Sequence, residues 1–185
     1  MRNFVLGVLV TLAVLSLGGL GAAMLGFVPT NANAEPPRFE KHIAMSAVDA
    51  SVDKHASHMT SPIQPSAENL IDGMKIYTMN CSVCHGTLDR KPSTLVTSFY
   101  PPPPQLVQDP PDDPDWHNYY VVRNGIRYTG MPAWDKTLSD QDIWKVTLFL
   151  SHIEKLPAAA QDYWKSAFGV QAPAGGSVHQ EHEHH

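Results

Sequence analysis

The sequence YTMNCSVCHGT, residues 77–87, contains both cysteines of this 185-residue chain, Cys81 and Cys84, and His85 directly follows the second. Two cysteines at this spacing occur in three kinds of site: a redox-active dithiol, half of a zinc site, or a covalent haem attachment site. A plain disulfide between Cys81 and Cys84 is a fourth possibility. The surrounding sequence discriminates among them.

The context of the pair argues against the first two kinds. A redox-active dithiol usually follows a strand within a βαβ unit, whereas the apolar spacing before Cys81 predicts a helix. A structural zinc site needs four ligands, and the other candidates, His117 and His152, show no paired ligand spacing. Covalent haem attachment explains every residue of the motif. Each thiol adds to one vinyl group of the porphyrin, and His85 is presented to the iron from the same side.

An apolar segment opens the chain, because residues 4–28 contain no ionisable side chain. As a helix this segment is about 37 Å long, enough to span a hydrocarbon core of roughly 30 Å. The sequence Ala32-Asn33-Ala34 also resembles a signal-peptidase site, so residues 1–34 are a transmembrane anchor or a cleaved signal; the long apolar stretch favours the anchor. Arg2 precedes the segment, so a single-pass anchor leaves the N-terminus in the cytosol and the remainder on the periplasmic side of the cytoplasmic membrane.

Composition divides the rest of the chain. Residues 35–65 form a linker or stalk, 66–172 a globular domain, and 173–185 a flexible His-rich tail, to which we assign no role. In the stalk, apolar residues three or four apart predict an amphipathic helix that packs on the domain or lies at the lipid surface; a weakly structured stalk is the alternative. The apolar positions are Phe39, Ile43, Ala47, Val48, Val52, Ala56 and Met59, before Pro62 and Pro65.

The globular domain is expected to be all-α. A helix capped by Ser66 delivers the chain to Cys81, and further helices are predicted for 116–123, 139–156 and 158–168. The proline-rich stretch between 101 and 114 excludes interior helix and central strand alike.

Three segments occur in the order found in the class I cytochrome c family and resemble it over about residues 66–157: GMKIYTMNCSVCHG (73–86), GMPAW (130–134) and DQDIWKVTLFLSHI (140–153). The resemblance implies the all-α class I cytochrome c fold, in which short helices and long loops surround one covalent haem c. It also implies that the first and last helices of the domain cross near a small glycine, a contact matched by Gly73, Tyr77 and Phe149.

The resemblance implies that Met131, in Gly-Met-Pro, is the sixth iron ligand opposite His85. Among the seven methionines, only Met131 lies far enough beyond the cysteine pair to reach the other face; His117 and His152 are alternatives. The family also places a carbonyl near Pro104 as the acceptor for the His85 Nδ1–H. The candidate haem-binding residues are Cys81, Cys84, His85, Met131, Pro104, Leu106, Trp134, Arg123 and Arg127, of which Trp134 and the two arginines are candidates for contact with the haem propionates.

The expected function is electron transfer and not catalysis, because ligation by histidine and methionine leaves no open position on iron. The partners would be membrane-bound redox complexes or other cytochromes of a respiratory or photosynthetic chain. The alternatives are a haem-bearing subunit of a membrane oxidase or dehydrogenase complex, and a haem sensor or peroxidase. The net charge of −5 gives no indication of nucleic-acid binding, which needs a basic face.

Overall fold

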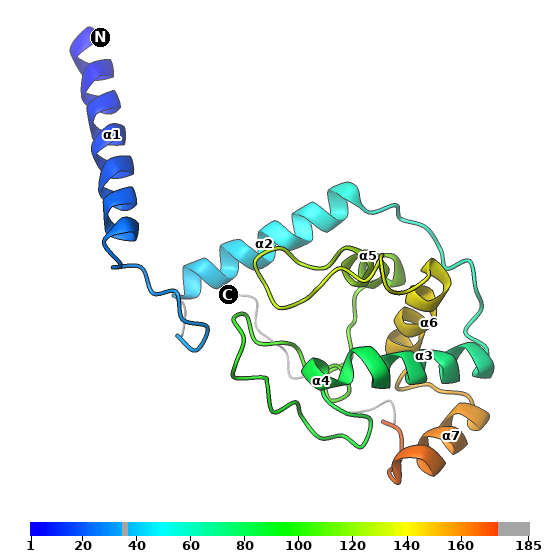
Figure 1. Ribbon diagram of the computed structural model, residues 1–185. Coiled ribbons are helices and arrows are strands. Elements are labelled where there is room, and N and C mark those ends of the chain that lie inside the picture. Colours follow the sequence, from blue (N-terminus) through cyan, green and yellow to red (C-terminus); the bar gives the residue numbers. More distant parts are fainter. Residues whose placement is uncertain (35–36, 174–185) are drawn as a thin grey trace. The chain divides into compact units, whose positions relative to one another are not determined.

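The computed structural model describes residues 1–34 and 37–173, and over these residues the protein is all-helical, with seven helices and no strand (Figure 1). The chain forms two compact units, which divide after Ala34. The helices are α1 (Arg2–Met24), α2 (Arg38–His55), α3 (Ala67–Asn80), α4 (Ser82–His85), α5 (Asp115–Asn124), α6 (Asp140–Ser151) and α7 (Ala158–Phe168).

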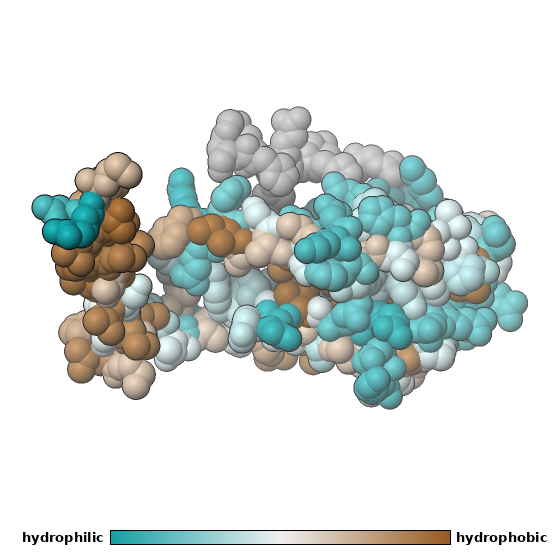
Figure 2. Space-filling model, turned by 90° about the horizontal axis from the view of Figure 1, so that it is seen from above, coloured by the Kyte–Doolittle hydropathy of each residue, from teal (hydrophilic) through white to brown (hydrophobic). Residues whose placement is uncertain are grey.

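The first unit consists of α1 and the short segment after it. No residue of α1 is buried, and the face of α1 seen in Figure 2 is mostly hydrophobic. By length and composition α1 qualifies as a helix that could cross a membrane. This agrees with the single span predicted at the N-terminus.

In the second unit, the crossing of α3 and α6 forms the centre of the core. Gly73 allows the close approach, because a Cβ atom at this position would lie 2.3 Å from the carbonyl oxygen of Lys145 and 2.7 Å from Cβ of Phe149. One turn further along α3, the ring of Tyr77 packs edge-on against Phe149 with centroids 5.7 Å apart. Beside the crossing, Lys145 pairs with Asp72 at 2.9 Å. The glycine–aromatic contact expected from sequence is therefore confirmed.

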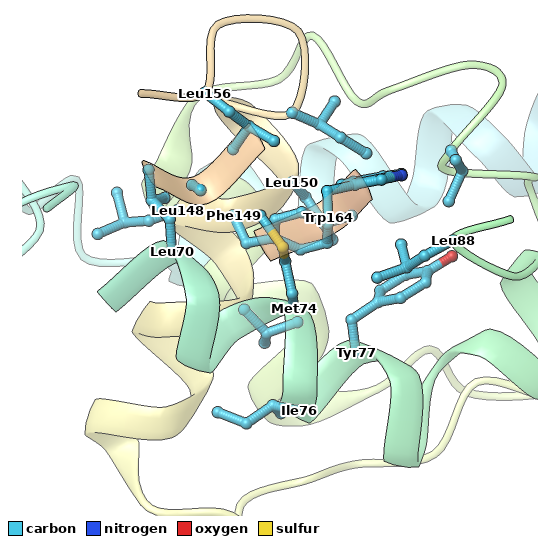
Figure 3. Packing of buried hydrophobic residues seen from close by; sticks show 14 residues of the cluster. Leu70, Met74, Ile76, Tyr77, Leu88, Leu148, Phe149, Leu150, Leu156 and Trp164 are labelled. Carbon is cyan, nitrogen blue, oxygen red and sulfur yellow. The ribbon is translucent and has the colours of Figure 1, made fainter. Parts of the chain in front are cut away.

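Helix α7 completes this core. The indole of Trp164 is fully buried and lies 6.0 Å, centroid to centroid, from the ring of Phe149. Figure 3 shows Met74, Tyr77 and Trp164 directed into the same cluster. Leu88 and Val107, one near each end of the long loop between α4 and α5, belong to this cluster as well. The irregular loop is thus attached to the helical core at two apolar points.

Helix starts agree closely with the sequence-based expectations. Ser66 caps α3 by accepting a hydrogen bond from the backbone N–H of Asn69, and Ser139 caps α6 by accepting one from Asp142. Two helix ends were predicted too late. The stalk helix ends at His55 and not near Met59, and α6 ends at Ser151 and not at 156.

Both helices end where the backbone leaves the α-helical conformation although apolar positions continue. Ala56, after α2, is extended with ψ 138. After α6, the backbone N–H of Ile153 donates to the carbonyl oxygen of Leu150, three residues back, as in a tighter turn. The apolar pattern that suggested a longer α6 is still used, because Ile153 is buried in the turns that follow. The predicted His-rich tail lies, from 174 onward, outside the described residues.

Replacing Gly73 with alanine should destabilise the domain, since the new methyl group would overlap the backbone of α6. We expect a loss of about 2 kcal/mol in the free energy of unfolding, which lowers the thermal midpoint by about 10 °C. Circular dichroism of the full chain in detergent measures it. Gly18→Ala is the matched control, since a Cβ there meets nothing within 4 Å; equal midpoints for both variants would contradict the assignment.

Candidate haem site

The two cysteines and the histidine lie on one turn directly after α3. Cys81 ends α3 and begins α4, and its carbonyl oxygen accepts hydrogen bonds from the backbone N–H groups of Cys84, at 3.1 Å, and His85, at 2.9 Å. Both thiols are free and half-buried, so no disulfide joins them. The tight turn thus holds two thiols and an imidazole within one short segment.

The environment keeps the first thiol neutral. Burial, with a smaller contribution from the charge of Cys84, raises the pKa of Cys81 to about 12. A redox-active dithiol needs one cysteine with a lowered pKa, whereas the pKa of Cys81 is raised. The raised pKa disfavours a thiolate at Cys81, so this cysteine is poorly suited to be the attacking thiol of a redox-active dithiol.

The imidazole of His85 is held in one tautomer. Its Nδ1 lies 2.8 Å from the carbonyl oxygen of Pro104. Because a carbonyl oxygen can only accept, the proton is on Nδ1 and the lone pair is on Nε2. Burial lowers the pKa of His85, with the bond to Pro104 acting in the opposite direction. A neutral imidazole with a free Nε2 is the form that binds a metal.

The peptide after the imidazole is also fixed. The hydroxyl of Tyr77 lies 2.9 Å from the carbonyl oxygen of His85 and 2.8 Å from that of Gly86, so its hydrogen is available to both. The backbone N–H of Leu106 donates to the same His85 carbonyl at 3.2 Å. Gly86 has φ +86, which favours glycine. Helix α3 therefore helps to position His85, because the Tyr77 hydroxyl holds the backbone carbonyl of that residue.

A second loop carries Met131, which is half-buried. Gly125 ends α5 with φ +66, and a Cβ atom there would lie 2.8 Å from the Met131 carbonyl oxygen. That carbonyl accepts a hydrogen bond from the backbone N–H of Ile126 at 3.2 Å. A Cβ at Gly130 would lie 2.6 Å from the ring of Phe99. The methionine loop therefore packs against the same long loop that supplies Pro104.

The remaining candidates are placed less closely. Leu106 packs against the core cluster, and the backbone N–H of Trp134 donates to the carbonyl oxygen of Val122 in α5. Arg127 is exposed. Arg123 makes an ion pair with Asp140, its Nε lying 3.2 Å from the carboxylate.

The two alternative sixth ligands have other contacts. His117 lies 3.8 Å from Asp113 and packs edge-on against Trp116. His152 is engaged with the Leu148 carbonyl.

These donor groups fit a covalently attached haem. Two free thiols on one turn, an imidazole with its Nε2 lone pair available, and a thioether in a separate loop are the donor types that such a haem uses. Within the described residues, no three histidine, cysteine, aspartate or glutamate side chains come together as a metal-ion site. Cys81 and Cys84 would hold the porphyrin, and His85 and Met131 would hold the iron.

Sequence reasoning did not identify three supporting groups: the Tyr77 hydroxyl, the Gly86 backbone and the Gln105 side chain. Tyr77 and Gly86 both lie within the segment 73–86, where the sequence indicated a packing position for Tyr77 but no role for its hydroxyl. Gln105 lies between two candidate residues, Pro104 and Leu106, and a polar side chain between two apolar ones was the available signal.

Residues 68–150 match the family model described as "Cytochrome C oxidase, cbb3-type, subunit III". No curated protein matches the chain. Among solved structures, a chain of the reducing HAO-like protein complex of Kuenenia stuttgartiensis aligns with a TM-score of 0.42 and 23% identity, over 49% of this chain and 46% of that one. The family match, together with the helical fold and the cysteine–histidine turn, shows that this chain carries a cytochrome c domain preceded by an apolar N-terminal helix.

Proposed function

We propose that this protein is an electron-transfer cytochrome that carries one haem c on Cys81 and Cys84, with His85 and Met131 as the residues that would hold the iron. The observation that supports it most directly is the hydrogen bond from His85 to the Pro104 carbonyl. It fixes an imidazole, on the same turn as two free thiols, in the tautomer that presents Nε2 to iron.

When bound, a haem supplies an iron centre that gains and loses one electron at a time. The protein's own residues then determine how it does so. A thioether from Met131 stabilises the reduced form and raises the potential. Ligation from both sides closes the iron to substrates, which suits electron transfer. Trp134, Arg123 and Arg127 remain proposed contacts of the propionates, and Arg123 would make that contact while adjacent to Asp140.

We further propose that α1 anchors the domain to the cytoplasmic membrane as a single span, with the haem domain on the periplasmic side. The length and mostly apolar surface of α1 support this. In this arrangement its electron partners are membrane-bound redox complexes or other cytochromes. By chain length alone, the 13 residues from 25 to 37 reach at most about 45 Å when fully extended, which sets the upper limit on the distance between the end of α1 and the start of α2.

Helix α2 has a face suited to contact with the membrane. Its Val52 is buried and its Val48 half-buried, whereas Phe39 and Ile43, one turn apart, are 68% and 63% exposed. Ile43 and Val52 are nine residues apart, about two and a half turns, so they lie on opposite sides of the helix. One side therefore packs on the domain, and we propose that the other contacts the lipid headgroup region.

A second function, the haem-bearing subunit of an oxidase, is favoured by one specific observation. The family that matches residues 68–150 is described as an oxidase subunit. A free-standing carrier and a complex subunit share the same site chemistry and differ only in their partners. Purification of the full chain in mild detergent separates them, because a subunit co-purifies with a stoichiometric oxidase whereas a carrier does not.

The mature protein should contain one haem joined by two thioether bonds. Intact-mass analysis should show the polypeptide plus one haem, and the haem should stay with the protein during acid–acetone extraction. The same mass reports whether residues 1–34 are retained. In a Cys81→Ser, Cys84→Ser double variant, any haem should become extractable. Extractable haem in the unaltered protein, or a mass with a different number of haems, would contradict the proposal.

Met131→Ala should open one axial position on the iron. The oxidised variant should lose the weak sulfur-to-iron absorption band, and the reduced variant should bind carbon monoxide, which the parent protein should not. The matched control is Met79→Ala, because Met79 is 74% exposed on α3. If the Met131 variant keeps the sulfur-to-iron band, another residue is the ligand.

The proposed lipid contact of α2 predicts slow amide exchange over residues 38–47 when the full chain is in lipid nanodiscs. Replacing Phe39 and Ile43 together with serine should speed this exchange several-fold, since the apolar anchors are lost. Hydrogen–deuterium exchange with mass spectrometry measures it. Met45→Ser is the control, because Met45 is exposed on a different side of the helix. Equal exchange in both variants would argue against the contact.

A further inference from the structure

The side chain of Gln105 connects the two peptide segments that meet at the proposed imidazole ligand. Its Nε2 donates to the carbonyl oxygen of Cys84 at 3.1 Å and to that of Pro103 at 2.9 Å. Cys84 immediately precedes His85, and Pro103 immediately precedes Pro104, the acceptor of the His85 Nδ1–H. One amide group therefore sets the separation between the imidazole and its hydrogen-bond acceptor.

The oxygen of the same amide is also used. The backbone N–H of Ser93 donates to Oε1 of Gln105 at 2.6 Å. Ser93 is itself buried, and its hydroxyl donates to the carbonyl oxygen of Val83 on the haem-attachment turn. With both amide hydrogens donated to carbonyls and the oxygen facing an N–H group, only one orientation of the amide satisfies all three bonds. The Gln105 side chain is therefore fixed in place.

Gly86 provides the space for this arrangement. A Cβ atom at Gly86 would lie 3.1 Å from Oε1 of Gln105 and 3.4 Å from Oε1 of Gln108. The glycine directly after the histidine thus has a second use beyond its positive φ, since it lets the glutamine amide lie against the haem-attachment turn. A larger residue would push the amide away from its three partners.

We propose that Gln105 is a positioning residue for the His85 imidazole and thereby tunes the reduction potential of the haem. This inference rests on the proposed function. The hydrogen bond from Nδ1–H to a carbonyl makes the imidazole a stronger electron donor, which favours oxidised iron. Without Gln105, the Pro104 carbonyl is held only by the loop backbone, so this bond lengthens, donation weakens and the potential rises.

Gln108 offers a matched control on the next turn of the same loop. It has the same side chain, but it is exposed and its Nε2 donates to the carbonyl oxygen of Arg90 at 3.0 Å. That bond joins two residues of the same loop and involves neither the Cys84 nor the Pro103 carbonyl. Substitution of either glutamine removes hydrogen bonds within the loop. Only substitution of Gln105 removes the bonds that hold the segment carrying the Pro104 carbonyl, the acceptor for His85.

The test compares haem-loaded Gln105→Met and Gln108→Met with the parent protein, using the full chain in detergent. Methionine keeps the length of the side chain and removes its hydrogen bonds. For Gln105→Met we expect the equilibrium to shift toward reduced haem by about threefold, which is a rise of about 28 mV at 59 mV per tenfold for one electron. The electron paramagnetic resonance g values of the low-spin ferric iron should shift with it. Gln108→Met should change neither.

A parent-like potential and parent-like g values in Gln105→Met would overturn the inference, as would equal shifts in the two variants. If Gln105→Met does not accumulate, Gln105→Leu is measured in its place, because it also removes all three hydrogen bonds without adding a charge, and the same outcomes apply. Failure of the proposed function is distinguished by the parent protein, which would then carry no covalent haem. If the parent protein carries covalent haem but the Gln105 substitution leaves the potential and the g values unchanged, only the positioning role of Gln105 is contradicted.

Discussion

The close crossing of α3 and α6 at Gly73 determines where the chain delivers its chemically important residues. Because α3 runs without interruption from this crossing to Asn80, the position of Cys81 is fixed relative to α6 by one rigid helix. Tyr77, on the same helix, packs its ring on Phe149 and uses its hydroxyl to hold the peptide of His85. The Tyr77 side chain thus belongs both to the core and to the site. A shift of α3 relative to α6 at the crossing would therefore also move His85.

The long loop between α4 and α5 has no regular secondary structure, yet it supplies the acceptor for His85 and the packing surface for the Met131 loop. Its order comes from two sources. Leu88 and Val107 bury apolar side chains in the helical core, and a small number of polar side chains satisfy the backbone groups that a helix or sheet would otherwise satisfy. Gln105 alone accounts for three of these hydrogen bonds.

Local patterns in the sequence were sufficient to predict where the helices of the domain begin and which faces they bury. Ser66 and Ser139 mark helix starts, and the apolar spacing of α6 and α7 identifies their buried faces. The same patterns overestimated two helix lengths, because the apolar spacing continues into residues that leave the helical conformation, such as the buried Ile153. The cysteine–histidine turn and the segment near Pro104 were also accessible from sequence. By contrast, the roles of Tyr77 and Gln105 depend on contacts between residues 8 to 21 positions apart, which a single sequence does not reveal.

Helix α5 connects the stalk to the proposed ligand loop. At its start, Trp116 stacks on His58, with ring centroids 3.9 Å apart, which holds the chain that leaves α2. In its middle, Tyr119 stacks on Trp144 of α6 at 4.1 Å, which fixes α5 to the core. At its end, Gly125 turns the chain into the loop that carries Met131. All three connections are made by one ten-residue helix. The position of the stalk relative to the methionine loop is therefore set by α5. A membrane contact made by α2 would therefore orient the haem site as well as tether it.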